Sequence, residues 1–287
     1  MECKMVEQID ISVVIVIYKK NDLDLSATLV SLKPYIHLFN NITIVNNGPE
    51  ALLVNESLYF KKKNVTIIEH LANRSLSSIY NDFIKGKSSE RFVILDDDTE
   101  ILDSYISNLV FSRKKFDLGL PIIRSNHDKK IYYPVNRNTS LKDNFEYNHQ
   151  KGDYSISSGM IISSKLINRL CKEFGNVFDE RFSLYGVDIS LFKRLDRLVI
   201  NKAVFIQSGT ILEHDLSKFS KDSSKFRKKE LLIDLILQNN IYGDNFIKIS
   251  LKNILFFLKG ISLLDSVAIK HTFYALIYKK HYRSEYK

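Results

Sequence analysis

The sequence RFVILDDD (residues 91–98) joins an apolar run to three consecutive carboxylates. Phe92 to Leu95 are residues typical of a short strand that is buried on both faces. Asp96, Asp97 and Asp98, which we call the acidic triplet, follow without a spacer. A buried strand must end where such charges begin, because burying an unpaired charge is costly. The stretch therefore predicts a core strand that delivers carboxylates to the edge of a sheet.

Strand-like and helix-like segments alternate around this stretch. The predicted strands are residues 11–18, 42–45, 65–68 and 91–95, and the predicted helices are residues 22–39 and 75–86. Such alternation predicts an α/β fold with a mostly parallel sheet flanked by helices. Ligands bind these sheets beyond the carboxyl ends of the strands. We therefore expect Tyr18, Asn46, Asn47, Asn73 and the acidic triplet to meet in one crevice.

The second half of the sequence has a less regular pattern. It predicts short strands and loops over 121–160, helices over 164–173 and 189–197, a strand over 198–206 and an extended segment over 211–214. After Ser217 the composition becomes Lys-rich and helical. We therefore expect one domain over residues 1–217 and a basic helical extension over residues 218–287.

Charge separates these two parts of the chain. The 287 residues contain 42 Lys and Arg against 33 Asp and Glu, a net charge of +9. Residues 221–287 hold 13 basic and 6 acidic residues, whereas the first 220 hold 29 and 27. A nucleic-acid-binding protein would carry a basic groove on its main domain. The near-neutral first part therefore argues against nucleic acid as a partner.

Cysteine content and hydropathy indicate the compartment. Cys3 and Cys171 are too few and too far apart for a disulfide scaffold or a Cys-rich zinc site, and they fit a reducing compartment. No window reaches the roughly 18 apolar residues that span a bilayer, and the polar N-terminus has no export signal. We expect a cytoplasmic protein that does not cross a membrane.

The acidic triplet has three interpretations. Oxygen-rich clusters bind Mg²⁺ or Mn²⁺, usually together with substrate phosphates. A solvated turn that caps the next helix would use the same residue types. A haloacid-dehalogenase phosphatase would need the pattern DxDxT, but Glu100 stands where that pattern requires Thr. The end of a strand in an α/β sheet favours the metal–phosphate interpretation.

Six segments together resemble a known family. They are ISVVIVIY (11–18), IVNNG (44–48), NRSLSSIYNDF (73–83), VILDDDTEI (93–101), FDERFSLYGVDISLFKRL (178–195) and ILEHDLS (211–217). In this order they are similar to inverting GT-A glycosyltransferases of family 2, over roughly residues 10–217. The resemblance implies a Rossmann-like GT-A domain, with a nucleotide-sugar half over about 10–120 and an acceptor half over about 121–217.

The resemblance also assigns roles in donor binding. Asp96 and Asp98 match the family's DxD motif, in which the first carboxylate contacts the nucleotide or sugar and the second holds the metal across the diphosphate. Asp97 lies between them and is included among the donor-binding residues. Tyr18 and Asn46 fall where members of the family bind the base.

Five further positions complete the expected site. Asn73 and Arg74 lie in the loop that closes around the nucleotide. Asp188 matches the family's general base, although Val187 and Ser190 replace two neighbouring acidic residues of that motif. Two expectations come from the residues themselves. His214, which follows a short apolar strand, would join the metal or the diphosphate, and Gly159 would allow close approach to the donor sugar.

These residues, together with the resemblance to bacterial surface-polysaccharide members of the family, imply a metal-dependent inverting transferase. It would move a sugar from a UDP- or dTDP-linked donor, with galactose and rhamnose the leading sugars, to a hydroxyl of a lipid-linked oligosaccharide in O-antigen or capsule synthesis. A sugar nucleotidyltransferase is an alternative, although residues 18–21 lack the Gly-rich phosphate loop that it would need. A non-catalytic basic protein that binds nucleic acid or membrane, or a scaffold with an inactive site, is a second alternative.

The C-terminal sequence predicts a basic amphipathic helix. Lys248, Lys252 and Lys259 lie on one side of it, beside a row of apolar residues. Such helices lie on anionic membranes, so we expect peripheral attachment to the inner face of the cytoplasmic membrane. Alternatively, the helices cap the catalytic domain or pack against a second copy in a homodimer.

Overall fold

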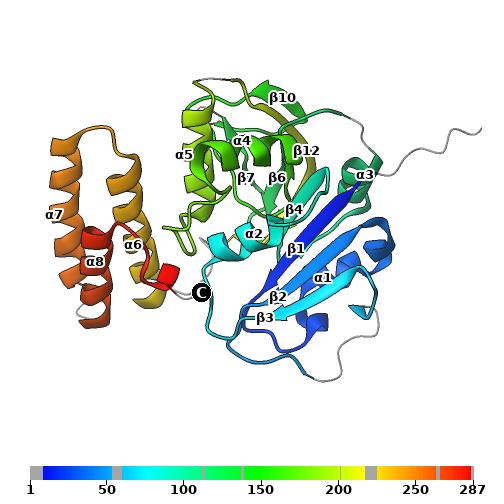
Figure 1. Cartoon of the computed structure of the whole chain (residues 1–287), viewed down its shortest axis with the longest axis horizontal. Helices are drawn as coiled ribbons and strands as arrows, with labels where there is room; N and C mark the ends of the chain where they lie inside the picture. The colour runs from blue at the N-terminus through cyan, green and yellow to red at the C-terminus, as the bar shows by residue number, and fades with distance from the viewer. Residues whose placement is uncertain are drawn as a thin grey trace, which may run out of the picture.

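The computed structural model describes residues 9–53, 60–111, 114–136, 139–200, 202–216, 225–262 and 266–285. A single mixed sheet with the strand order β10-β12-β6-β11-β4-β1-β2-β3 forms its centre, and helices cover both faces (Figure 1). A separate group of C-terminal helices lies at one end of the molecule (Figure 1). Cys3 and the boundary predicted at residue 217 lie outside the described residues.

The first half builds the parallel part of the sheet. Its strands are β1 (Ile11–Ile17), β2 (Asn41–Asn46), β3 (Val65–Glu69) and β4 (Arg91–Asp96). β1 pairs in parallel with both β2 and β4, and β2 pairs in parallel with β3. All seven residues of β1 are buried, because helices cover both of its faces. The carboxyl ends of these strands therefore lie on one edge of the sheet, as predicted.

The predicted helix over residues 22–39 is wrong in its continuity. The chain instead forms η1 (Leu23–Leu25), α1 (Ala27–Leu32) and η2 (Lys33–Leu38), where η denotes a 3₁₀ helix. Ser26 caps α1 by accepting a hydrogen bond from the Leu29 N–H, which fixes a new start inside the predicted helix. Pro34, at the start of η2, lacks the N–H that a continuing α-helix requires. The predicted helix over 75–86 is confirmed as α2 (Leu76–Ile84).

The second half adds a mixed region to the same sheet. The strands of this half are β5 (Thr99–Glu100), β6 (Leu118–Ser125), β7 (Ile131–Tyr133), β8 (Val135–Asn136), β9 (Thr139–Ser140), β10 (Phe145–Asn148), β11 (Met160–Ser163) and β12 (Phe205–His214). β8 and β9 pair with each other in a separate two-stranded sheet, and the other six belong to the central sheet. Its helices are α3 (Asp103–Phe111), α4 (Ser164–Phe174) and α5 (Val187–Leu198). β11 is antiparallel to β4 and β6, whereas β12 is parallel to β6.

The strand predicted over 198–206 is wrong in its start. Helix α5 continues to Leu198, and β12 begins only at Phe205. Short apolar runs do not distinguish a buried strand from the end of a buried helix, and here Leu195 and Leu198 complete the buried face of α5.

The C-terminal helices are α6 (Lys225–Tyr242), α7 (Phe246–Ser262) and α8 (Ser266–Tyr278), followed by η5 (Tyr282–Glu285). Leu232, Ile233, Ile236 and Leu237 of α6 belong to the same apolar core as residues of α5 and the sheet. Helix α6 is therefore packed into the main core, while α7 forms the outer edge of the molecule (Figure 1). The division at residue 217 stays a prediction.

Candidate active site

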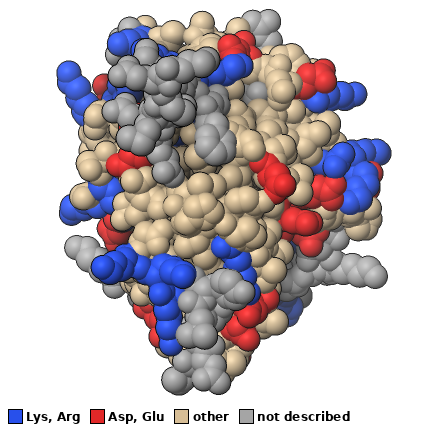
Figure 2. Space-filling view, turned by 90° about the vertical axis from the view of Figure 1, so that its right-hand side faces the viewer, with Lys and Arg blue, Asp and Glu red and all other residues tan. Residues whose placement is uncertain are grey.

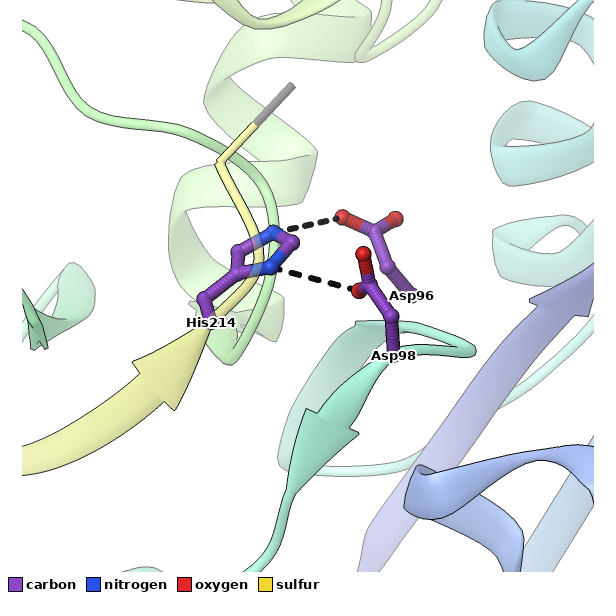
Figure 3. Close-up of side chains that lie close together, drawn as sticks. All are labelled: Asp96, Asp98 and His214. Atoms are coloured by element: carbon purple, nitrogen blue, oxygen red, sulfur yellow. Dashed lines mark ion pairs between the residues drawn. The ribbon is translucent and has the colours of Figure 1, made fainter. Parts of the chain in front are cut away.

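The acidic triplet meets His214 at the edge of the sheet. Asp96 ends β4, and Asp98 lies just before β5. β5 pairs antiparallel with the end of β12, with Thr99 opposite His214, and this pairing brings the imidazole beside the carboxylates. Figure 3 shows the ring on one side of both carboxylates, with one nitrogen facing Asp96 and the other facing Asp98. His214 Nε2 lies 3.5 Å from Asp96 Oδ2, and Nδ1 lies 3.2 Å from Asp98 Oδ1.

Burial and charge shift the pKa values of Asp98 and His214 in this cluster. Burial, together with the neighbouring carboxylates, raises the pKa of Asp98 to about 7, although His214 opposes the shift. Burial alone would lower the pKa of His214, but hydrogen bonding to Asp96 and the charge of Asp98 outweigh it and raise the pKa. The neighbouring carboxylates therefore favour the protonated form of His214 in the protein alone.

The donor atoms of this cluster fit a divalent cation. One ligand atom from each of Asp96, Asp98 and His214 lies within 4.8 Å of the others. Asp98 Oδ1 and His214 Nδ1 are both buried and make no hydrogen bond. Buried polar atoms without a hydrogen-bond partner are suited to bind an ion or a water, and carboxylate oxygens with an imidazole suit Mn²⁺ or Mg²⁺. A cation would replace the proton of His214, because only neutral imidazole binds a metal.

Asp188 lies near this cluster on a separate element. It is the second residue of α5, and its side chain is only partly exposed. Burial raises the pKa of Asp188 to about 7, the charge of Asp96 adds to the rise, and hydrogen bonding to Ser157 opposes it. The preceding Val187 is buried in the apolar core, so Asp188 is the carboxylate that this turn directs toward the site. A carboxylate with a pKa near neutrality is suited to accept a proton.

The loops after β1 and β3 meet beside the triplet. Tyr18, which is 37% exposed, accepts a hydrogen bond at its hydroxyl from Asn73 Nδ2 at 3.4 Å. The backbone N–H of Tyr18 donates to Asp97 at 3.3 Å, and Lys20 forms a 3.0 Å ion pair with the same carboxylate. The structure thus brings Tyr18, Asn73 and the triplet together, with Asp97 bracing the loop after β1.

The side chains of Asn46 and Arg74 contact other residues and not the acidic triplet. The Asn46 side chain is fully buried and donates to the Glu50 carbonyl and the Glu69 carboxylate. The Arg74 guanidinium forms a 2.6 Å ion pair with Asp82 on α2. Their assigned donor contacts stay predictions, and the contacts present in the structure shape the loops around the crevice.

The neighbouring Asn47 joins these loops. Its side chain donates to the Arg74 carbonyl at 3.0 Å and accepts from the Arg74 N–H at 2.9 Å. This reciprocal pair fixes the segment after β3 against the end of β2. The Asn-Asn-Gly turn at 46–48 was the sequence signal for such a role, because Asn side chains mimic backbone groups in turns.

Gly159 serves packing in this structure. It has φ +77°, is buried, and a Cβ at this position would collide with Leu212 and lie 2.8 Å from Pro121 Cγ. Its position is therefore restricted to glycine by both conformation and space. The adjacent Ser158 hydroxyl hydrogen-bonds to Thr99 Oγ1 at 2.7 Å and ties this turn to the acidic triplet.

Tyr80 was not among the site residues predicted from the sequence. This α2 residue is completely buried, and burial raises its pKa well above the usual value, with Asp96 and Asp188 adding to the rise. Tyr80 thus lies close to both Asp96 and Asp188.

Helix α6 supports the N-terminus of α5. Tyr242 donates to the buried Asp179 carboxylate at 2.7 Å, and its ring stacks on Phe182 at a centroid distance of 6.0 Å. Gly186 contacts the carboxyl of Asp234 so closely that a Cβ at this position would collide with it. The extension therefore contacts the turn that leads directly into Asp188.

A separate cavity of about 530 Å³ lies at the opposite, N-terminal end of the strands and is lined in part by Glu90, Arg91 and Asp117. Arg91 there donates to the Leu109 carbonyl at 2.5 Å and lies over the Phe116 ring. These contacts hold the strand ends together, and the cavity is remote from the acidic triplet.

Surface charge is mixed on the side of the sheet opposite the C-terminal helices. Basic and acidic side chains alternate around an uncharged centre on that face, and among the side chains described there no continuous basic groove forms (Figure 2). None of the described helices has the length and apolar character needed to cross a bilayer.

Solved structures share this fold. The chain superposes on S. aureus TarS 1–349 in complex with UDP-GlcNAc with a TM-score of 0.54 and 13% identity, over 84% of this chain and 69% of that one. The superposition on TarS 1–349 without a ligand has a TM-score of 0.51 and 13% identity, and it covers 93% of this chain and 72% of that one. The superposition on TarS 1–349 in complex with UDP has a TM-score of 0.52 and 14% identity, and it covers 84% of this chain and 68% of that one.

No family model and no curated protein matches the sequence. At 13–14% identity the structural likeness concerns the fold. The predicted α/β fold of GT-A type, a largely parallel central sheet flanked by helices, is confirmed.

Proposed function

We propose that the chain is a metal-dependent inverting glycosyltransferase that uses a nucleotide-diphospho-sugar. The observation that carries this proposal is the meeting of Asp96, Asp98 and His214 at the carboxyl edge of the sheet, with two buried polar atoms lacking hydrogen bonds. TarS 1–349, which shares this fold, forms complexes with UDP-GlcNAc and with UDP, and this supports a uridine diphosphate donor.

Asp96, Asp98 and His214 would hold the cation. A bound divalent cation supplies positive charge that neutralises the departing diphosphate. Tyr18 and Asn73, hydrogen-bonded to each other beside the triplet, would contact the nucleotide. Asn46, Arg74, Asp97 and Gly159 would shape the loops that bind the donor.

Asp188 would remove the proton from the attacking acceptor hydroxyl. Direct attack on the anomeric carbon breaks its bond to the diphosphate, forms one new glycosidic bond and inverts that centre. One base is sufficient for such a displacement, and a pKa of about 7 leaves Asp188 a stronger base than an ordinary aspartate.

The proposal also names an acceptor. We propose a hydroxyl of a lipid-linked oligosaccharide in surface polysaccharide synthesis, with the protein in the cytoplasm and peripheral on the membrane. The basic C-terminal helices support this assignment, because they would bring the site to the surface that holds such an acceptor.

The experiment begins with a thermal-shift panel of UDP-GlcNAc, UDP-galactose and dTDP-rhamnose, each with and without Mn²⁺. The donor that stabilises the protein is then used in a turnover assay of Asp188→Asn. We expect donor binding to be retained and kcat to fall about 100-fold or more. Glu173→Gln, which removes an exposed carboxylate on α4, is the control. Undiminished turnover by Asp188→Asn would show that Asp188 is not the base. A melting temperature that no donor raises would contradict the proposed reaction.

A further inference from the structure

Helix α7 exposes an apolar stripe along its length. Ile247, Leu251, Ile254, Leu255 and Leu258 are each between 56% and 69% exposed. Their spacing places them on one face of the helix, since residues three and four apart are neighbours on a helix surface. We call these five residues the α7 stripe. Large side chains exposed together in this way mark an interaction surface.

The opposite face of α7 is already packed. Asn253 accepts a hydrogen bond from Asn239 of α6 at 2.9 Å and donates one to Asn240 at 2.8 Å. Phe256 packs against the main apolar core. These contacts fix the rotation of α7, so the stripe must face away from α6.

Three exposed lysines flank the stripe. Lys248, Lys252 and Lys259 share one side of α7, because their spacing of four and seven residues follows the helical repeat. Residues 246–262 and 266–278, which form α7 and α8, contain no Asp or Glu. The two helices thus combine an apolar surface with uniformly positive charge.

We infer that the α7 stripe docks on the surface of an anionic lipid bilayer. An amphipathic helix with lysines beside its apolar face lies in the interface, where side chains enter the acyl boundary and ammonium groups meet phosphates. A second copy would bring only further lysines from the same two helices and no carboxylate to pair with them. Phosphate head groups supply the missing negative charge, so charge complementarity favours lipid.

The position of α7 suits this partner. The helix lies at the edge of the molecule farthest from the sheet, with its packed face toward α6 (Figure 1). Helix α6 in turn contacts the turn before Asp188. The inference extends the proposed function by naming the surface on which it takes place, but vesicle binding itself does not depend on glycosyl transfer.

The test is co-sedimentation of the full chain with vesicles, without nucleotide sugar. Vesicles of equal parts phosphatidylglycerol and phosphatidylcholine should bind the protein, and phosphatidylcholine alone should bind it far less. The triple variant Lys248→Gln, Lys252→Gln, Lys259→Gln should weaken binding to the anionic vesicles on the order of 100-fold. Leu251→Ser combined with Leu255→Ser should weaken it at least about tenfold through lost apolar burial.

The matched control removes three exposed lysines from the predicted catalytic domain over residues 1–217. Lys62→Gln, Lys85→Gln and Lys172→Gln together make the same change in net charge and should leave vesicle binding within about twofold. Unchanged melting temperatures would show that each variant is folded.

Absence of wild-type binding, equal binding to neutral vesicles, or equal loss in the control triple would overturn the inference. Light scattering after size exclusion tests the second copy as occupant. Suppose that the wild type is a dimer that does not bind vesicles, and that Leu251→Ser combined with Leu255→Ser converts it to monomers. This result would assign the stripe to a homodimer interface and refute docking on lipid. Failure of the donor assay alone would refute the proposed function and leave the vesicle result intact.

Discussion

Asp234 is the carboxyl through which the C-terminal extension contacts the turn before Asp188. It lies on α6, is only 9% exposed, and its Oδ1 makes no hydrogen bond. Burial raises its pKa from 3.8 to about 7, and hydrogen bonding with Gln238 opposes the rise. The folded protein therefore favours the neutral acid, and ionisation above neutral pH destabilises the contact with α5.

The size of this effect follows from the pKa change. A rise from 3.8 to about 7 corresponds to about 4 kcal/mol when ionisation is complete. Because the folded pKa is raised, the stabilisation is fully present below pH 3.8 and is lost as the pH rises through about 7. About 3 kcal/mol of the loss develops between about pH 5 and about pH 8.

Asp234→Asn keeps the shape of the side chain and cannot ionise. We expect the free energy of unfolding of the variant, relative to wild type, to rise by about 3 kcal/mol between about pH 5 and about pH 8. Urea unfolding at several pH values measures this difference and cancels all other titrating groups. Asp143→Asn, which removes an exposed loop carboxylate, should show no such trend. A difference for Asp234→Asn that is constant with pH would refute the reasoning.

Three further changes test the packing around the site. Gly159→Ala should lower the free energy of unfolding by about 2–4 kcal/mol, because strain adds to a steric collision. Gly86→Ala has the same φ of +77° in open space and should cost only about 1–2 kcal/mol, so equal losses in urea titrations would contradict the packing argument. Tyr242→Phe removes a hydrogen bond to a buried carboxylate and should cost about 1–3 kcal/mol by the same measurement, and a neutral result would remove that bond from the account. Glu230→Gln takes the charge partner from buried Arg283 and should lower stability by about 3 kcal/mol or more, and retained stability would show that this pair is not needed.

Strand ends were the most predictable feature of the molecule. The apolar run before the acidic triplet could only be a buried strand, so the position of Asp96 and Asp98 followed from its length. Asp188 was predicted near the start of a helix and lies there, on α5. The position of His214 beside the triplet depended on the pairing of β12 with β5, which the short extended segment at 211–214 only suggested.

The features that the sequence did not reveal are those decided by tertiary contacts. Asn46 has the residue type of a ligand-binding position, but its amide is satisfied by Glu50 and Glu69 inside the fold. The glycine at 159 is required by Leu212, more than fifty residues away. Periodicity along a single element carries no information about such distant partners.

The contacts of α6 with α5 were likewise not predictable in detail. The sequence predicted a basic extension and left its packing on the catalytic domain as one alternative, and the structure buries Glu230, Ile233 and Asp234 of α6. Glu230 is satisfied by His281 and Arg283, which approach from the C-terminal end of the chain. A charged residue can be buried only where such partners exist, and sequence spacing alone does not show them.

The central claim is that Asp96, Asp98 and His214 bind a divalent cation together with a nucleotide diphosphate. Calorimetric titration of UDP into the protein, with and without Mn²⁺, measures this coupling most directly. We predict binding that Mn²⁺ strengthens at least about tenfold in the wild type, and loss of that dependence in Asp98→Ala. Equal UDP affinity with and without Mn²⁺, or an Mn²⁺ dependence that survives in Asp98→Ala, would contradict the account.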